Sequence, residues 1–269
     1  MPHITPAHFL QYQVMIHLVG CGGNGSQMLT GLARLNHALT ALGHPGLNVI
    51  AFDPDTVSEA NMGRQMFGQF DVGSSKAIVL VSRINAFFGL NWEAHFGRYE
   101  AGKGAPDMLI ACVDSAKSRY EIANDRALRH PNKPYYLMDM GNRAADGQVL
   151  FGELANADGS PAHKAPAGSA RLPDPYRVLP ELIDLTAIED DTPSCGLAEA
   201  LERQELFVNQ AIVTPALSIL WEFFRHGRLT WHGAFVNLRT GSMRPLLVKE
   251  PASIPEAADA EEVRVRVMA

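Results

Sequence analysis

The stretch "GCGGNGSQ" (residues 20–27) lies between an apolar run and a segment with helical spacing. The run over 14–19 predicts a buried strand, and 25–42 predicts a helix that closes at "GHPG". Gly20, Gly22 and Gly25 fit G-x-G-x-x-G: the first permits a tight turn, the second lets a ligand approach the main chain, and the third packs helix on strand. Such turns also occur for structural reasons alone. The strand-turn-helix context favours a nucleotide, with phosphate or ribose at the helix N-terminus.

A carboxylate follows the second predicted strand. Residues 47–52, "LNVIAF", form this strand, which ends at Asp53. A carboxylate there can accept hydrogen bonds from both ribose hydroxyls, or it can cap a turn. An NAD-dependent oxidoreductase would share the feature, so Asp53 does not identify the nucleotide.

Strands alternate with helices over the first 150 residues. Further strands are expected at 92–99, 107–114 and 134–142, with helices at 76–88 and 115–130. This alternation predicts an α/β fold: a doubly wound, mostly parallel, Rossmann-like sheet with helices on both faces.

The composition changes after this part of the chain. We expect an ATP-binding core over 1–154, a long connection over 155–193 with a short helix at 178–188, and a completing segment over 194–249. This last segment is predicted to hold a helix from 196 to 226, interrupted by Pro215, and a hairpin that turns at "RTGS" (239–242). Residues 250–269 read as a flexible tail, in which "VRVRV" could add an edge strand.

The bulk composition excludes several function classes. The chain has 269 residues, 46% hydrophobic and 19% charged, which is enough to bury a full core. A net charge of -6 argues against nucleic acid and anionic membranes as partners. No apolar run reaches the length of a membrane span, and the first lysine or arginine is Arg34, so we expect a cytoplasmic protein.

Three cysteines are too few and too widely spaced for a disulfide framework or a cysteine zinc site. Cys21 and Cys112 lie in the glycine loop and in a predicted buried strand, and both are expected to serve packing. Cys195 opens a predicted helix after "DDTPS". The helix dipole there lowers a thiol pKa and favours a nucleophilic thiolate, although a buried cysteine at a helix start is also common.

Three further stretches, "DPDTVSEANMGRQMF" (53–67), "DVGSSKA" (71–77) and "ACVDS" (111–115), carry a family resemblance. With the glycine loop, they resemble the E1-like activating enzymes of the ThiF/MoeB/HesA superfamily. The resemblance covers about 14–150, returns in "PSCGLAEA" (193–200) and fails over 155–190. The ending "GAFVNLRTG" (233–241) is similar to the ThiF-related member of the PRTRC system.

The resemblance implies that ATP adenylates the C-terminal glycine of a small ubiquitin-like or sulfur-carrier protein, and that the enzyme is a homodimer. It implies that Arg64 and Lys76 hold the triphosphate, because cations must neutralise the phosphates before a carboxylate can attack. Asn61 and Gln65 would then fix the triphosphate geometry by hydrogen bonds. Taken singly, Arg64 and Lys76 could also be ordinary surface charges.

The same resemblance gives Asp114 the role of holding Mg²⁺, directly or through water, since a hard cation prefers oxygen ligands. Asp114 could instead cap the helix that follows. Asp55 could assist the metal or cap the turn "TVSEAN" (56–61). Cys195 would form a thioester or persulfide in some members, whereas others stop at the acyl-adenylate.

Two departures from the family pattern leave a second function open. The paired C-x-x-C motifs that commonly hold zinc are missing, and His163, His226 and His232 offer no matching spacing, so no zinc is expected. The arginine that the family commonly supplies from an N-terminal helix is also missing. A nucleotide-binding scaffold with reduced chemistry is therefore the alternative. The connection over 155–190 could clamp the tail of the carrier protein.

Overall fold

The computed structural model describes residues 1–63, 65–100, 106–125, 128, 136–156, 159–161, 163–186, 202 and 204–249. Its strands are β1 (His3–Ile4), β2 (Val14–Val19), β3 (Leu47–Asp53), β4 (Glu93–Phe96), β5 (Met108–Ala111), β6 (Tyr136–Asn142), β7 (Asp146–Glu153), β8 (Arg228–Leu229), β9 (Trp231–Asn237) and β10 (Ser242–Leu247). Its α-helices are α1 (His8–Gln11), α2 (Gly23–Ala41), α3 (Lys76–Phe88), α4 (Ala116–Asn124), α5 (Pro175–Val178) and α7 (Val208–Trp221). Short 3₁₀ segments are η1 (Glu59–Asn61), η2 (Gln69–Asp71) and η3 (Pro180–Ile183), and η4 (Glu222–His226) is a π-helical turn.

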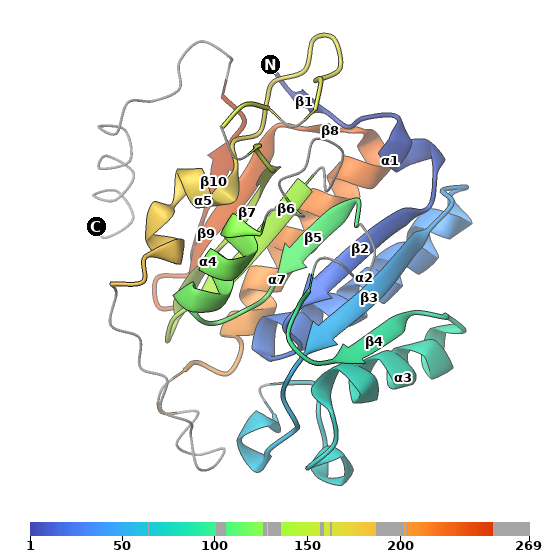
Figure 1. Ribbon diagram of the computed structural model, residues 1–269, viewed down its shortest axis with the longest axis vertical. Coiled ribbons are helices and arrows are strands. Elements are labelled where there is room, and N and C mark those ends of the chain that lie inside the picture. Colours follow the sequence, from blue (N-terminus) through green and yellow to red (C-terminus); the bar gives the residue numbers. More distant parts are fainter. Residues whose placement is uncertain are drawn as a thin grey trace.

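One large sheet organises the molecule (Figure 1). Its eight strands run in the order β10-β9-β7-β6-β5-β2-β3-β4. The five strands from β6 to β4 pair in parallel, whereas β7, β9 and β10 pair antiparallel. The chain therefore has the mixed, mostly parallel α/β sheet that the alternation of segments predicts.

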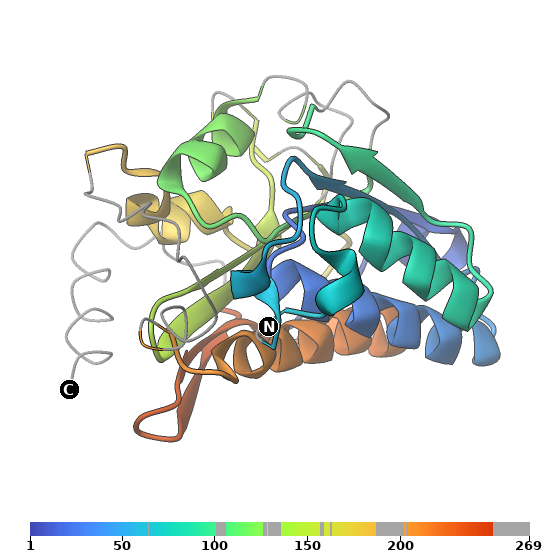
Figure 2. The same cartoon turned by 90° about the horizontal axis from the view of Figure 1, so that it is seen from below.

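Helices cover both faces of the sheet. Figure 2 shows α2 and α7 side by side beneath it, with α4 and α5 on the opposite side. The larger hydrophobic cluster joins the inner faces of α2, α3 and α7 to the sheet, and a smaller cluster lies under α4 and Tyr176. The β2 strand is central, and its C-terminal residue Val19 pairs with Phe52 on one side and Ala111 on the other. The carboxyl ends of β2, β3 and β5 therefore meet at one edge of the sheet.

The helices of the second half differ from the sequence prediction. The short helix expected at 178–188 is replaced by α5 and η3, because Asp174 caps α5 through the N–H of Tyr176 and Pro180 cannot continue it. The helix was expected to run from 196, but 196–201 and 203 lie outside the described residues; α7 itself begins at Val208. Residues 204–207 are not helical, and Glu205 N–H instead bonds the carbonyl of Ala144.

The expected interruption at Pro215 is wrong. Pro215 lies inside α7, which continues to Trp221. A proline removes only the hydrogen bond to the carbonyl four residues earlier, and the buried face of Ile212, Ala216 and Ile219 holds the helix against the sheet. The hairpin after it is confirmed, since β9 and β10 pair antiparallel around the turn at 238–241. The "VRVRV" segment and the predicted tail lie outside the residues that the structure describes.

Candidate functional site

The glycine loop lies at the carboxyl end of β2, in the conformation that its sequence requires. Gly20 has φ +91°, and a Cβ there would lie 2.8 Å from the carbonyl oxygen of Cys112. A Cβ on Gly25 would collide with the carbonyl oxygen of Gly20, so α2 can pack on β2 only without a side chain at this position. At Gly22 a Cβ would meet only Nε2 of Gln65, at 4.0 Å. The protein itself therefore closes around the first and third glycines and leaves room at the second, where a ligand would approach.

No side chain of the described residues caps the N-terminus of α2. Gly22 occupies the N-cap position, and the first turn holds no acidic residue. Amide groups of buried side chains surround this turn: Asn209 lies against Gly23, and Asn24 donates to Oδ1 of Asn142 at 3.0 Å. Asn24 Oδ1, Asn209 Nδ2 and Gln65 Oε1 are buried and have no hydrogen-bond partner among the residues that the structure describes. This end of the helix thus combines uncapped amides with unused polar atoms, which suits a polar or anionic ligand.

Asp53 ends β3 beside the loop and supports its main chain. Its carboxylate accepts hydrogen bonds from the N–H of Cys21, at 2.5 Å, and of Asp55, at 2.7 Å. Burial raises the pKa of this carboxyl group, and both hydrogen bonds oppose the rise. Asp53 therefore caps the two turns, which is one of the two roles that the sequence predicted for it. A carboxylate has about four lone-pair sites, so these bonds leave acceptor capacity for ribose hydroxyls.

Lys76 is the first residue of α3 and lies close to Asp53. Its ammonium group forms an ion pair with Asp55, with 2.9 Å between Nζ and Oδ2. The lysine side chain is 10% exposed and the aspartate side chain 62%. The positive charge also lowers the pKa values of Asp53 and Cys21, although burial outweighs this effect at both. Lys76 is therefore a buried cation at the edge of the site, and Asp55 is an exposed counter-ion that a phosphate can displace.

Asp114 follows β5 on the same edge and is exposed. The cap of α4 is Ser115, whose side chain accepts from the N–H of Ser118 at 3.2 Å. Asp114 is therefore not the helix cap that the sequence left open, and its carboxylate remains available. Cys112, two residues before Asp114, donates its N–H to the carbonyl of Val19 at 2.8 Å. Val19 is the last residue before the glycine loop, so Asp114 lies two residues beyond this contact.

The remaining candidates divide into three kinds. Gln65 lies beside Gly22, as a ligand-binding role requires. The Asn61 side chain is occupied in the turn, where its Oδ1 accepts from the N–H of Ser58 at 2.8 Å in a capping box. Arg64 and Cys195 lie outside the described residues, so their roles stay predictions.

Cys21 and Cys112 are both buried, and burial raises both thiol pKa values. A thiol that stays protonated is a poor nucleophile, so packing is the role that the structure supports for these two. Sequence reasoning missed the amides around the loop. Asn24 was visible inside the glycine motif, but nothing in the helical pattern of α7 indicates that Asn209 faces Gly23.

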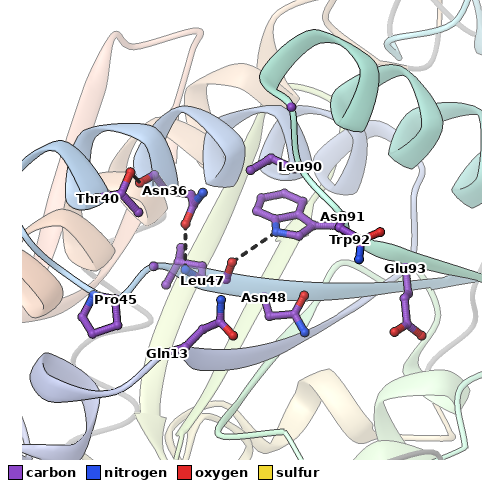
Figure 3. Close-up of a pocket in the computed structure, with 12 residues that line it drawn as sticks. Gln13, Asn36, Thr40, Pro45, Leu47, Asn48, Leu90, Asn91, Trp92 and Glu93 are labelled. Carbon is purple, nitrogen blue, oxygen red and sulfur yellow. Dashed lines mark hydrogen bonds between the residues drawn. The ribbon is translucent and has the colours of Figure 1, made fainter.

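A polar pocket of about 370 Å³ lies at the other end of the parallel strands (Figure 3). Gln13, Leu47 and Trp92 line it at or near the starts of β2, β3 and β4, and it contains none of the predicted site residues. Across the described ranges, no group of three or more His, Cys, Asp or Glu side chains is arranged to hold a metal ion. No helix in the same ranges is long and apolar enough to cross a membrane.

Comparison with known proteins identifies the fold. Crystal structures of E. coli MccB (14% identity, TM-score 0.55) and of PaaA (12% identity, TM-score 0.52) match 91% and 88% of this chain, and in each case 65% of theirs. A structure of E. coli MccB with AMPCPP and MccA matches 90% of this chain and 66% of its own length, at 14% identity and a TM-score of 0.53. The chain thus spans slightly less than two thirds of these proteins. A comparison with curated protein sequences found no match.

The sequence comparison identifies the family. The model of the ThiF family matches residues 11–172, more than half of the chain. The matched range contains the glycine loop, Asp53, Lys76 and Asp114. This chain, with its Rossmann-like, E1-like fold, belongs to the ThiF family.

Proposed function

We propose that the protein is an ATP-dependent adenylating enzyme. Its substrate would be the C-terminal glycine carboxylate of a small ubiquitin-like or sulfur-carrier protein. The observation that carries the proposal is the cluster at the carboxyl edge of the sheet, where the uncapped glycine loop follows β2, the exposed carboxylate of Asp114 follows β5, and Lys76 begins α3. Membership in the ThiF family supports the same reaction.

The residues present suit ATP. Space at Gly22 and the uncapped amides of α2 can take phosphate oxygens, and the lone pairs left on Asp53 can take ribose hydroxyls. Lys76 can exchange its exposed partner Asp55 for a phosphate. Because no group of three or more metal-binding side chains is found in the described part of the chain, Mg²⁺ would be held by Asp114, phosphate oxygens and water.

The chemistry then follows from charge. A carboxylate oxygen of the carrier attacks the α-phosphorus, the bond to the bridging oxygen breaks, and pyrophosphate leaves with the electron pair. Lys76 and the helix amides would neutralise charge that develops on the phosphates, and Arg64 is proposed to act with them. Mg²⁺, when bound, supplies further positive charge at the leaving group. Gln65 would orient the phosphates, and Asn61 would do so through its Nδ2, because its Oδ1 is held by the N–H of Ser58.

The proposal also covers a second reaction step, the assembly of the enzyme and its biological context. We propose Cys195 as the nucleophile of a later thioester or persulfide step, a homodimer as the assembly, and the connection over 155–193 as a cover for the carrier tail. The PRTRC system is the proposed context, on the basis of the ending "GAFVNLRTG". No zinc is expected.

Pyrophosphate exchange tests the main proposal. Radiolabelled pyrophosphate should enter ATP only in the presence of a carrier protein that ends in glycine. The matched control is the same carrier without its last glycine, which should support no exchange. If no candidate carrier with a free C-terminal glycine supports exchange, adenylation is wrong.

One observation favours a second candidate, a nucleotide-binding scaffold. Lys76 is already paired with Asp55, which reduces the positive charge available to the phosphates. Tight ATP binding without AMP formation, together with unchanged carrier binding in Arg64→Ala, would select the scaffold. Calorimetric titration with NAD in place of ATP tests the oxidoreductase alternative in the same experiment.

A further inference from the structure

A buried ion pair lies directly beneath the loop that carries Asp114. Arg119 belongs to α4 and Asp139 to β6, and their side chains are 7% and 0% exposed. Nε of Arg119 lies 3.0 Å from Oδ2 and 3.3 Å from Oδ1 of Asp139. The pair is therefore closed off from water and has a defined geometry.

The rest of the guanidinium group bonds the main chain. Nη2 of Arg119 donates to the carbonyl of Val113 at 2.6 Å and to that of Met140 at 3.3 Å, and Nη1 donates to the carbonyl of Asp114 at 3.2 Å. These carbonyls belong to the loop after β5 and to the end of β6. One planar group thus holds both segments in a fixed relation.

Tyr176 completes the network from a distant part of the chain. Its hydroxyl donates to Oδ2 of Asp139 at 3.1 Å. Tyr176 lies in α5, within the connection that was predicted over 155–193. Asp139 and Arg119 therefore link Tyr176 of this connection to the loop after β5.

The burial of this ion pair does not by itself indicate a stabilising role. Replacement of a buried ion pair by apolar residues is often neutral or stabilising, so such a pair is weak evidence of a stabilising role. A lysine would keep the charge but lose the fork that spans several carbonyls. The geometry of Arg119 is best explained by what it holds, which is the main chain of Val113 and Asp114.

We propose that Arg119 is a positioning residue: it fixes the main chain of Asp114, so that the exposed carboxylate stays at the edge of the glycine loop. Asp139 orients Arg119, and Tyr176 ties the pair to the connection. The metal-holding role of Asp114 rests on the proposed function.

Equilibrium binding of ATP gives a readout that does not depend on catalysis. Calorimetry would compare the dissociation constant of ATP in EDTA with that in Mg²⁺, and the ratio of the two measures the gain due to the metal. We expect Asp114→Asn to bring this ratio close to one. Loss of a group that orients a metal ligand typically lowers metal affinity by about 10-fold to 100-fold, so Arg119→Lys should lower the ratio by about tenfold.

Two further variants exclude a general structural effect. Arg171 forms an ion pair with Glu153, with 3.0 Å between Nη1 and Oε1, and neither residue lies in the loop that carries Asp114. Arg171→Lys should therefore keep the wild-type ratio. The double variant Arg119→Lys/Asp114→Asn should show the same ratio as Asp114→Asn alone, because the two residues act on one interaction. Independent effects would multiply instead.

Several results would overturn the proposal. These are a wild-type ratio in folded Arg119→Lys, an equal loss in Arg171→Lys, or a ratio of one in the wild-type protein. If Arg119→Lys does not fold, Tyr176→Phe decides: it should lower the ratio by up to about fivefold, and an unchanged ratio refutes the link. A normal Mg²⁺-dependent gain without carrier-dependent exchange would reject adenylation and leave this proposal intact.

Discussion

The two ends of the parallel strands use polar side chains in different ways. At the amino ends, side chains that line the pocket satisfy the hydrogen-bonding groups of the main chain. Asn36 Oδ1 accepts from Leu47 N–H at 2.7 Å, and Trp92 Nε1 donates to the carbonyl of Leu47 at 3.1 Å (Figure 3). At the carboxyl ends, within the described part of the chain, Asn24 and Asn209 keep buried atoms without partners, and α2 begins without a side-chain cap. Burial of an unpaired polar atom costs free energy, so such atoms mark the edge where a ligand is expected.

The largest expected effect concerns the cation of the carboxyl edge. Lys76→Met keeps the aliphatic stem and removes the charge, so pyrophosphate exchange should fall by about 10²-fold to 10³-fold, which corresponds to about 3 to 4 kcal/mol in the transition state. The matched control is Lys117→Met, at an exposed position on α4, and it should exchange at the wild-type rate. Equal rates in both variants would remove Lys76 from the site.

Another buried atom without a partner among the described residues, Nε2 of His17, lies within β2 and away from both of its ends. Burial lowers the pKa of His17 to about 4, and the charge of His95 adds to the effect. The unfolded chain then binds a proton near pH 6.5 and the folded chain only near pH 4. The free energy of unfolding is therefore unaffected by the titration of His17 above pH 6.5. As the pH falls from 6.5 to 4, the low pKa of His17 reduces the free energy of unfolding by about 3 kcal/mol.

Urea unfolding of the wild type and of His17→Leu, at pH 7 and pH 4, measures this term. The wild type should lose about 3 kcal/mol more than the variant between the two pH values. Burial also lowers the pKa values of His3 and His232, but these residues contribute equally to both proteins. An equal loss in the two proteins would show that His17 is protonated as easily in the folded chain as in the unfolded one.

The glycine loop itself should tolerate no side chain at its third position. In Gly25→Ala the new methyl group meets the carbonyl oxygen of Gly20, so the free energy of unfolding should fall by about 2 to 3 kcal/mol. In Gly68→Ala the nearest atom would be 3.9 Å away, and the residue has φ -120°, so stability should change little. Thermal unfolding of both variants gives the comparison. A stable Gly25→Ala protein would contradict the close packing of α2 on β2.

The smallest effect is expected at the amino edge, and it should concern stability alone. Asn36→Ala leaves the buried N–H of Leu47 without its partner, which costs about 1 to 2 kcal/mol of unfolding free energy. Asn91→Ala, at an exposed residue of the same pocket, should be neutral. Both variants should keep the wild-type exchange rate. A loss of exchange in either would assign function to this end of the sheet.

The sequence predicted the core of the sheet well for a physical reason. Strands that are buried on both faces read as continuous apolar runs, and β2 and β3 each match the predicted run to within one residue. Helix α3, over Lys76–Phe88, was predicted in full, since Ser75 caps its start and Gly89 ends it. Gly20 follows the carboxyl end of β2, Asp53 ends β3 and Lys76 begins α3, and the adjacent parallel strands β2 and β3 bring these positions to one edge of the sheet.

The contacts that arise from tertiary structure could not be predicted. Whether Asp114 or Ser115 caps α4 depends on which side chain turns back, and the two are neighbours in sequence. The pairing of Arg119 with Asp139 joins residues 20 positions apart, and the approach of Asn209 to Gly23 joins a late helix to an early one. The periodicity of a helix predicts which of its faces is buried, but it does not predict which element packs against that face. In the second half of the chain, Asp174 and Pro180 set the helix limits more strongly than periodicity did.

The proline in β10 has a consequence for how these molecules behave at high concentration. Pro245 pairs with Ala234 inside the hairpin, and it has no N–H to offer to a strand arriving from solution. Arg244 beside it is exposed and adds a charge that an incoming strand would have to desolvate. This margin of the sheet therefore resists edge-to-edge stacking between molecules, which favours soluble protein over fibrous aggregates.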